Sequence, residues 1–151
     1  MKLVVVGTSH RHAPLERRER LRLGDERAAE VVRRLSADGH EAVALSTCNR
    51  TELYVAGPDA GRRADAELAS LGAGPGLYRY EDERAARHLF RVAAGLDSLV
   101  AGETQILGQV RAAHALALGV GSSGRTFRIL VDTMDRRGGA VATARLDVVA
   151  P

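Results

Sequence analysis

Cys48 is the residue of this chain best suited to chemistry, and it is the single cysteine among 151 residues. A thiolate is a strong nucleophile, and a nearby cation increases the fraction of a thiol that is ionised. Arg50 follows in the same polar run, and on a β-hairpin alternate residues share a face. Arg50 could therefore favour the thiolate or hold an anionic substrate beside it. Cys48 could also be a small core residue, but the polar neighbours Ser46, Thr47 and Asn49 favour the chemical interpretation.

Other polar residues give weaker signals. His88 lies near the apolar side of a predicted helix, where a histidine is more often packed than catalytic. A second polar cluster comprises Ser98 and residues 102–109, in which Glu103 and Gln105 fall near a predicted helix start and could meet a ligand. Helix capping with a solvent-exposed face is the simpler explanation of that cluster. One cysteine, without a histidine pair at helical ligand spacing beside a carboxylate, argues against a structural zinc site.

Residues 119–124 (GVGSSG) fit the pattern G-x-G-x-x-G of dinucleotide-binding loops. Such a loop must follow a strand and open a helix within a βαβ unit, with an acidic residue about 20 positions later. Here the pattern follows a predicted helix, and few residues remain to build a sheet. We therefore expect a loop between helices and no dinucleotide site in this chain.

Four short apolar runs predict the strands that must position these residues. The runs are residues 3–6, which Gly7 closes, and residues 42–45, 53–56 and 77–80. The second and third runs flank the polar segment 46–52, so a hairpin with Cys48 at or near its tip is expected.

Amphipathic segments and turn residues predict the helices. They are expected at residues 15–23, between Asp25 as a cap and Gly39, at 59–71, from about 81, at 103–118 and at 126–137. The inward residues are expected to be Ala28, Ala29, Val32, Leu35, Ala85, Leu89, Val92, Leu96, Ile106, Leu107, Val110 and Leu118. The order resembles a split βαβ, or ferredoxin-like, α+β fold followed by helices. We expect one domain over residues 1–151, with an α/β core over about 1–98 and a helical part over about 99–140.

Composition bounds the class of protein. Hydrophobic residues make up 45% and charged residues 27%, which argues against disorder, and no apolar run approaches the roughly 20 residues of a membrane span. Aromatic residues are only 3%, so an aliphatic core is expected. One cysteine and no signal-peptide pattern favour a cytoplasmic protein without a membrane partner. The net charge is +3 and every basic residue except Lys2 is Arg, which permits a nucleic-acid partner.

Three motifs together resemble the N-terminal catalytic domain of glutamyl-tRNA reductase. In chain order they are VGTSHRHAP at 6–14 with Arg18-Glu19 after it, STCNRTE at 46–52, and the pair HLFRVAAGLDSLV at 88–100 and GETQILGQV at 102–110. The resemblance covers about residues 1–118 well and the next twenty loosely.

The resemblance implies a mechanism. Cys48 would attack the ester that joins glutamate to its tRNA and form a thioester, which NADPH would reduce to glutamate-1-semialdehyde for tetrapyrrole biosynthesis. Arg50 would hold the side-chain carboxylate of glutamate, and His88 would donate a proton to the leaving ribose hydroxyl or orient another group. The substrate-binding positions it implies are Thr47, Cys48, Asn49, Arg50, Ser98, Glu103, Thr104, Gln105 and Gln109.

The chain also departs from the family pattern. Ser9 stands where the family usually has Asn, and residues 132–145 differ from its basic helix. The Rossmann NADPH domain and the dimerisation domain of the family are not expected here, so NADPH would serve the full-length enzyme. The expected partners are glutamyl-tRNA and glutamate-1-semialdehyde aminomutase. The alternative is a short non-catalytic homologue that binds charged tRNA, haem or the full-length reductase as a regulator.

Overall fold

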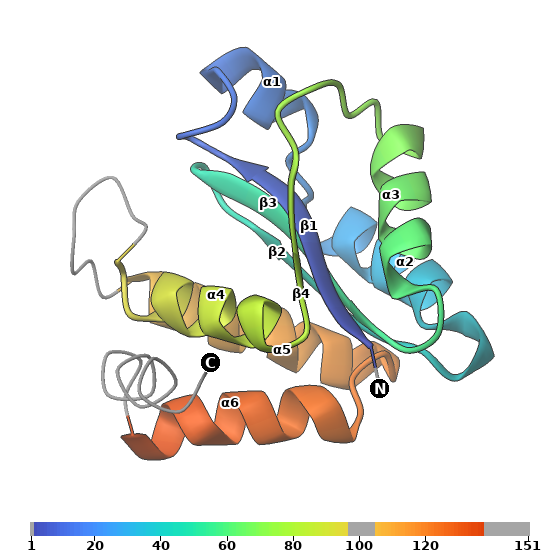
Figure 1. Cartoon of the computed structure of the whole chain (residues 1–151), viewed down its shortest axis with the longest axis vertical. Helices are drawn as coiled ribbons and strands as arrows, with labels where there is room; N and C mark the ends of the chain where they lie inside the picture. Colours follow the sequence, from blue (N-terminus) through green and yellow to red (C-terminus); the bar gives the residue numbers. More distant parts are fainter. Residues whose placement is uncertain (1, 97–104, 138–151) are drawn as a thin grey trace.

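The computed structural model describes residues 2–96 and 105–137, and within them the chain forms a four-stranded sheet between helices (Figure 1). The strands are β1 (Leu3–Ser9), β2 (Glu41–Ser46), β3 (Arg50–Ala56) and β4 (Tyr78–Glu81). Their order in the sheet is β2-β3-β1-β4, and every neighbouring pair is antiparallel. β1 and β2 are thus separated by β3, as in a split βαβ unit. The predicted ferredoxin-like α+β fold is confirmed.

Helices cover both faces of this sheet. They are α1 (Leu15–Arg20), α2 (Asp25–Leu35), the short 3-10 turn η1 (Ala37–Gly39), α3 (Ala60–Ser70), α4 (Glu83–Ala93), α5 (Gln105–Val120) and α6 (Arg125–Arg137). Helices α2 and α3 lie on one face, and α4 and α6 lie on the other (Figure 1). Helix α5 lies beside β2.

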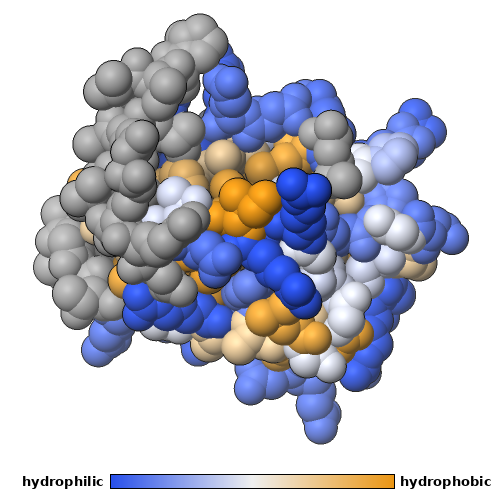
Figure 2. All heavy atoms as spheres, turned by 90° about the horizontal axis from the view of Figure 1, so that it is seen from below, coloured by the Kyte–Doolittle hydropathy of each residue, from blue (hydrophilic) through white to orange (hydrophobic). Residues whose placement is uncertain are grey.

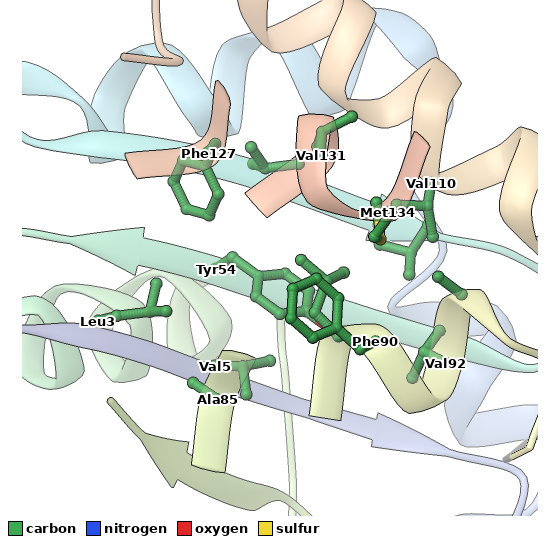
Figure 3. Close-up of a cluster of buried hydrophobic side chains, with 14 of the residues drawn as sticks. Leu3, Val5, Tyr54, Ala85, Phe90, Val92, Val110, Phe127, Val131 and Met134 are labelled. Carbon is green, nitrogen blue, oxygen red and sulfur yellow. The ribbon is translucent and has the colours of Figure 1, made fainter. Parts of the chain in front are cut away.

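Alternation along the strands supplies the two cores. Val4 and Val6 of β1 face α2 and α3, whereas Leu3 and Val5 face α4 and α6. The α2–α3 side is aliphatic, as expected. The other side departs from that expectation, because Tyr54, Phe90 and Phe127 pack there around Val131 and Met134 (Figure 3). Aromatic side chains are therefore concentrated in the core between the sheet and helices α4 and α6.

Some sequence-based expectations are wrong in detail. β1 does not end at Gly7 but continues to Ser9. Asp25 is the first residue of α2 and not its cap, a position that Gly24 takes without a side-chain bond. Leu96 is 40% exposed because α4 ends at Ala93.

Helix α5 gives another correction. Its buried residues are Ile106, Val110, His114 and Ala117, so the neighbouring Leu118 falls outside this stripe and is 41% exposed. Ile106 and Val110 are buried as expected and Leu107 packs against the same core, so the expectation is wrong only at Leu118.

Hydrophilic side chains dominate the face seen in Figure 2, with apolar patches between them. Within the part of the chain that the structure describes, no helix has both the length and the hydrophobicity of a membrane span.

Candidate active site

A three-residue connection, Thr47 to Asn49, joins β2 to β3 and carries Cys48 at its tip, as predicted. The connection is closed by a hydrogen bond from the Thr47 amide to the Arg50 carbonyl, 2.8 Å long. Arg18 braces it from outside, because its Nη1 donates to the Cys48 carbonyl over 2.9 Å. The Cys48 side chain is exposed to solvent. The Cys48 thiol is therefore accessible on a turn that these hydrogen bonds hold in place.

Arg50 and Glu52 belong to β3 and not to the connection, which corrects the longer polar loop expected from the sequence. The Arg50 side chain is only 2% exposed, and its Nη1 lies 3.4 Å from Oε2 of Glu52. Alternate strand residues share a face, so these two side chains lie on the same side of the sheet. Burial of a charged strand residue is tolerated here because the opposite charge is beside it.

Glu52 is the centre of a buried polar network. The Tyr54 hydroxyl donates to Oε1 over 2.9 Å, and the Tyr78 hydroxyl donates to Oε2 over 2.5 Å. Nε2 of His88 also bonds to Oε2. One carboxylate thereby ties together β3, β4 and α4, three elements that are separated in the sequence.

The charges around Glu52 decide its ionisation. Burial raises the pKa of Glu52, but the charge and hydrogen bond of His88, the charge of Arg50 and the Tyr78 hydrogen bond outweigh it, and the pKa falls to about 2. Burial, and then the charge of Glu52, raise the pKa of Tyr78 and of Tyr54. Glu52 is therefore a carboxylate at neutral pH, held by two neutral phenols.

An ionised Glu52 also fixes the ring of His88. A carboxylate can only accept hydrogen bonds, so Nε2 of His88 must carry the hydrogen that it donates to Glu52. A neutral His88 ring then has Nδ1 as its acceptor nitrogen, and only a charged ring can donate from Nδ1. The His88 side chain is 12% exposed, so it is close to the surface, and the buried Glu52 carboxylate holds its Nε2.

A cavity of about 440 Å³ opens above this network, between α4, β4 and the turn after β1. Arg50 and His88 both line it. Its described lining is completed by Ser9, Arg11, His12, Tyr78, Tyr80, Arg84, Arg87 and Arg91. The lining is strongly basic and carries aromatic rings: Tyr80 lies 4.9 Å from the His88 ring, centroid to centroid. We call it the basic cavity.

The structure brings together some of the predicted site residues and separates others. Arg50 and His88 share the basic cavity, while Cys48 lies just beyond Arg50 at the hairpin tip and is not among the residues that line it. Gln105 and Gln109 are exposed on α5. Gln109 lines a different hollow, which reaches Ser46, the last residue of β2. The predicted residues Ser98, Glu103 and Thr104 lie outside the described residues.

Sequence reasoning missed the buried carboxylate and several lining residues. Glu52 is a charged residue of a fully buried strand, and such a residue requires a partner of opposite charge. Tyr78 and Tyr80 are two positions apart on β4, so strand alternation places both on one face. Ser9, the position that differs from the family pattern, also lines the cavity, and its Oγ lies 3.1 Å from Nδ1 of His12.

Residues 119–124 do not fit a dinucleotide. The first two residues end α5 and the other four join it to α6, so the segment follows a helix, as expected, and not a strand. The carboxylate of Glu41 already occupies the amino end of α6, where it accepts from the amides of Gly124 at 2.7 Å, Thr126 at 3.3 Å and Phe127 at 3.4 Å. A pyrophosphate would need those same amides. Among the described residues, no three His, Cys, Asp or Glu side chains are grouped so that they could hold a metal ion.

The fold and the site together define a ferredoxin-like domain with an accessible thiol on a hairpin tip and a basic cavity that Arg50, two residues later in the chain, lines. The family model for the glutamyl-tRNAGlu reductase N-terminal domain matches residues 6–144. The chain therefore belongs to the glutamyl-tRNA reductase N-terminal domain family.

Individual relatives agree with this assignment. The chain is 55% identical over 118 residues to the glutamyl-tRNA reductase of Thermus thermophilus, covering 78% of this chain and 29% of the relative. It is 47% identical over 148 residues to that of Rubrobacter xylanophilus, covering 91% and 34%. The glutamyl-tRNA reductase from Methanopyrus kandleri superimposes with a TM-score of 0.77 at 34% identity, over 95% of this chain and 34% of that one. The chain thus spans about a third of the length of these relatives.

Proposed function

We propose that this chain is the thioester-forming part of a glutamyl-tRNA reductase, with Cys48 as the nucleophile. The observation that carries the proposal is the exposed Cys48 thiol on a braced hairpin tip, two residues before Arg50, which lines the basic cavity. A thiolate suffices as nucleophile because an aminoacyl ester is an activated acyl group. The substrate class is glutamyl-tRNA.

In the proposed reaction the Cys48 sulfur attacks the carbonyl carbon of the glutamyl ester. A carbon–sulfur bond forms, the carbon–oxygen bond to the ribose breaks, and the ribose oxygen takes up a proton. His88 can supply that proton from Nδ1, provided that its ring is charged, since Nε2 is bonded to Glu52. The product is a glutamyl thioester on Cys48 and free tRNA.

Arg50 is proposed to select glutamate. Its guanidinium is buried at the wall of the basic cavity, 3.4 Å from Glu52. A substrate carboxylate would gain a charge-assisted bond there, whereas the neutral amide of glutamine would not. The preference for glutamate over glutamine therefore follows from one buried cation.

We assign no hydride transfer to the described residues, because the glycine loop does not fit a dinucleotide. The proposal is that reduction of the thioester to glutamate-1-semialdehyde, for tetrapyrrole biosynthesis, depends on the full-length enzyme with NADPH. We further propose a cytoplasmic location and hand-over of the aldehyde to an aminomutase.

The test is covalent labelling. The chain is incubated with tRNA charged with labelled glutamate, and protein-bound label that hydroxylamine releases is counted. The parent should retain label, and Cys48→Ser should retain almost none while its circular dichroism and melting temperature stay unchanged. Retention of equal label by Cys48→Ser would show that the nucleophile is assigned wrongly. Tight binding of charged tRNA by both the parent and Cys48→Ala, without acyl transfer, would instead indicate a non-catalytic binding module.

A further inference from the structure

The basic cavity is lined by more arginines than a glutamyl group needs. A glutamyl ester carries one carboxylate and one ammonium group, so a single guanidinium, such as Arg50, balances its carboxylate. The described lining contributes four further arginines and no acidic residue; they are Arg11, Arg84, Arg87 and Arg91. A lining with this many arginines suits a second, more negative part of the substrate in the same cavity.

Three of these arginines form a row on α4. Arg84, Arg87 and Arg91 are spaced three and four residues apart, so they share one face of the helix, and His88 lies on that face as well. At about 1.5 Å per residue the row extends roughly 10 Å. Arg84 is exposed, whereas Arg87 and Arg91 are half-buried, so the row leads from the surface toward His88. A row of this length suits a chain of charges better than a single ion.

Aromatic rings accompany the arginine row. Tyr80 lines the cavity within 5.6 Å of the Tyr78 ring and 4.9 Å of the His88 ring. Tyr78 in turn lies 4.8 Å from the ring of His12. A cationic groove with aromatic faces is the usual combination for single-stranded nucleic acid, in which arginines follow the phosphates and bases stack on rings.

We propose that Arg84, Arg87 and Arg91 bind phosphates of the single-stranded 3′ end of the tRNA, and that Tyr80 stacks on one of its bases. The proposal rests on the proposed function, because the glutamyl ester that reaches Cys48 is attached to that end. Binding of the phosphates along α4 would deliver the ester past His88 and Arg50 toward the hairpin tip. The arginine row thus supplies affinity for the nucleic acid and leaves recognition of glutamate to Arg50.

The first test measures binding without chemistry. Uncharged tRNA is titrated onto the parent and onto the double variant Arg84→Gln with Arg91→Gln, at several salt concentrations. The matched control is Arg33→Gln with Arg62→Gln, which removes two exposed charges from α2 and α3 on the other side of the sheet. Loss of two phosphate contacts should lower the steepness of log K against log salt by about 1.4 and weaken binding roughly tenfold at low salt. The control should keep the slope of the parent.

The second test compares two acyl donors on Cys48. Labelled glutamyl-tRNA and a small glutamyl ester without phosphate are each supplied to both double variants. The α4 variant should lose far more acylation with the tRNA ester than with the small ester, and Tyr80→Leu should show the same bias. Equal losses with both donors would mean that the arginines serve the glutamyl group, which overturns the proposal.

Two further outcomes also bear on the proposed binding of RNA at the arginine row. Unchanged tRNA affinity and slope in the α4 variant, or an equal loss in the control, would overturn RNA binding at this row and leave the surface to a protein partner. If neither donor acylates the parent, the proposed function fails, yet the titration with uncharged tRNA still supports or overturns the arginine row by itself.

Discussion

The carboxylate of Glu52 links stability to chemistry at the scale of single residues. It is fully buried, accepts bonds from Tyr54 and Tyr78, and faces the charges of Arg50 and His88. Removing one partner of a buried ionic network leaves the others uncompensated, which is costlier than the loss of a surface pair. Glu52 is therefore a positioning residue for both cavity-lining side chains.

Glu52→Gln should lower the free energy of unfolding at neutral pH by roughly 3 kcal/mol, because it leaves Arg50 and His88 without their counter-charge. Urea unfolding measures this change. Glu26→Gln, which alters an exposed carboxylate on α2, should change stability by less than about 0.5 kcal/mol. A loss equally small for both variants would contradict the role of the network.

The pH dependence of stability follows from the lowered pKa of Glu52, about 2. A carboxylate with a lowered folded pKa contributes its full stabilisation above the unfolded pKa, near 4.5. That contribution is lost as pH falls from there toward 2. The parent should therefore lose stability more steeply than Glu52→Gln between about pH 4.5 and 2, in urea unfolding at each pH. Parallel curves for the two proteins would exclude Glu52 as the titrating group.

His88→Gln should slow acylation of Cys48 by about 100-fold, since proton transfer by a positioned side chain contributes at least that much. The glutamine amide can still donate to Glu52, so the network is kept while proton transfer is lost. The rate is measured as labelled thioester against time. A rate equal to that of the parent would assign His88 a structural role only.

Close contact between β1 and β3 matters at the scale of elements. A Cβ built on Gly7 would lie 2.4 Å from the Thr51 carbonyl oxygen and 2.8 Å from the Glu52 Cα, both backbone atoms that cannot rotate away. Gly7 is thus required where β1 passes the strand that carries the site. Its role is close approach and not a turn.

Gly7→Ala should destabilise the protein by about 2–3 kcal/mol, because overpacking forces β1 away from β3. The matched control is Gly108→Ala in α5, where a Cβ meets nothing within 4 Å. That change should stabilise the protein by about 0.5–1 kcal/mol, since alanine favours a helix interior. Chemical denaturation gives both values. Similar stabilities for the two variants would show that the sheet can yield at Gly7.

At the scale of the whole molecule, acyl transfer and reduction need different chemical groups. The described residues include an exposed thiol, a buried arginine and a histidine that line or adjoin the site in the chain, but Glu41 accepts hydrogen bonds from the amides at the start of α6. Hydride transfer requires a nicotinamide held next to the thioester carbon. We expect this chain to carry out acyl transfer by itself. Reduction of the thioester is expected to require the full-length enzyme.

This chain, given glutamyl-tRNA and NADPH, should release glutamate slowly and form no glutamate-1-semialdehyde. Water then hydrolyses the thioester. This is an esterase-like activity, and Cys48→Ser should abolish it. The measurements are NADPH absorbance, aldehyde and free glutamate in the same reaction. Aldehyde in proportion to oxidised NADPH would contradict the expectation and require a nicotinamide site in this chain.

The sequence by itself determined the order of the elements and a candidate nucleophile. Runs of β-branched residues and helical spacing gave the strand and helix order, because local preference and burial on one face act over short spans. The position of Cys48 at a hairpin tip followed from two apolar runs around a short polar segment. Errors of phase, as at Leu118, arose because a helix offers several neighbouring stripes and only its packing partners choose between them.

Only the tertiary structure decided which distant residues share the basic cavity. Tyr78 and His88 meet Glu52 because antiparallel pairing lays β4 beside β1 and α4 returns across that face of the sheet. The ionisation of Glu52 and the ring nitrogen that His88 offers depend on these contacts, which no local pattern contains. The sequence names a nucleophile because reactivity belongs to a residue type, whereas the charge surrounding it is a sum over neighbours that folding brings together.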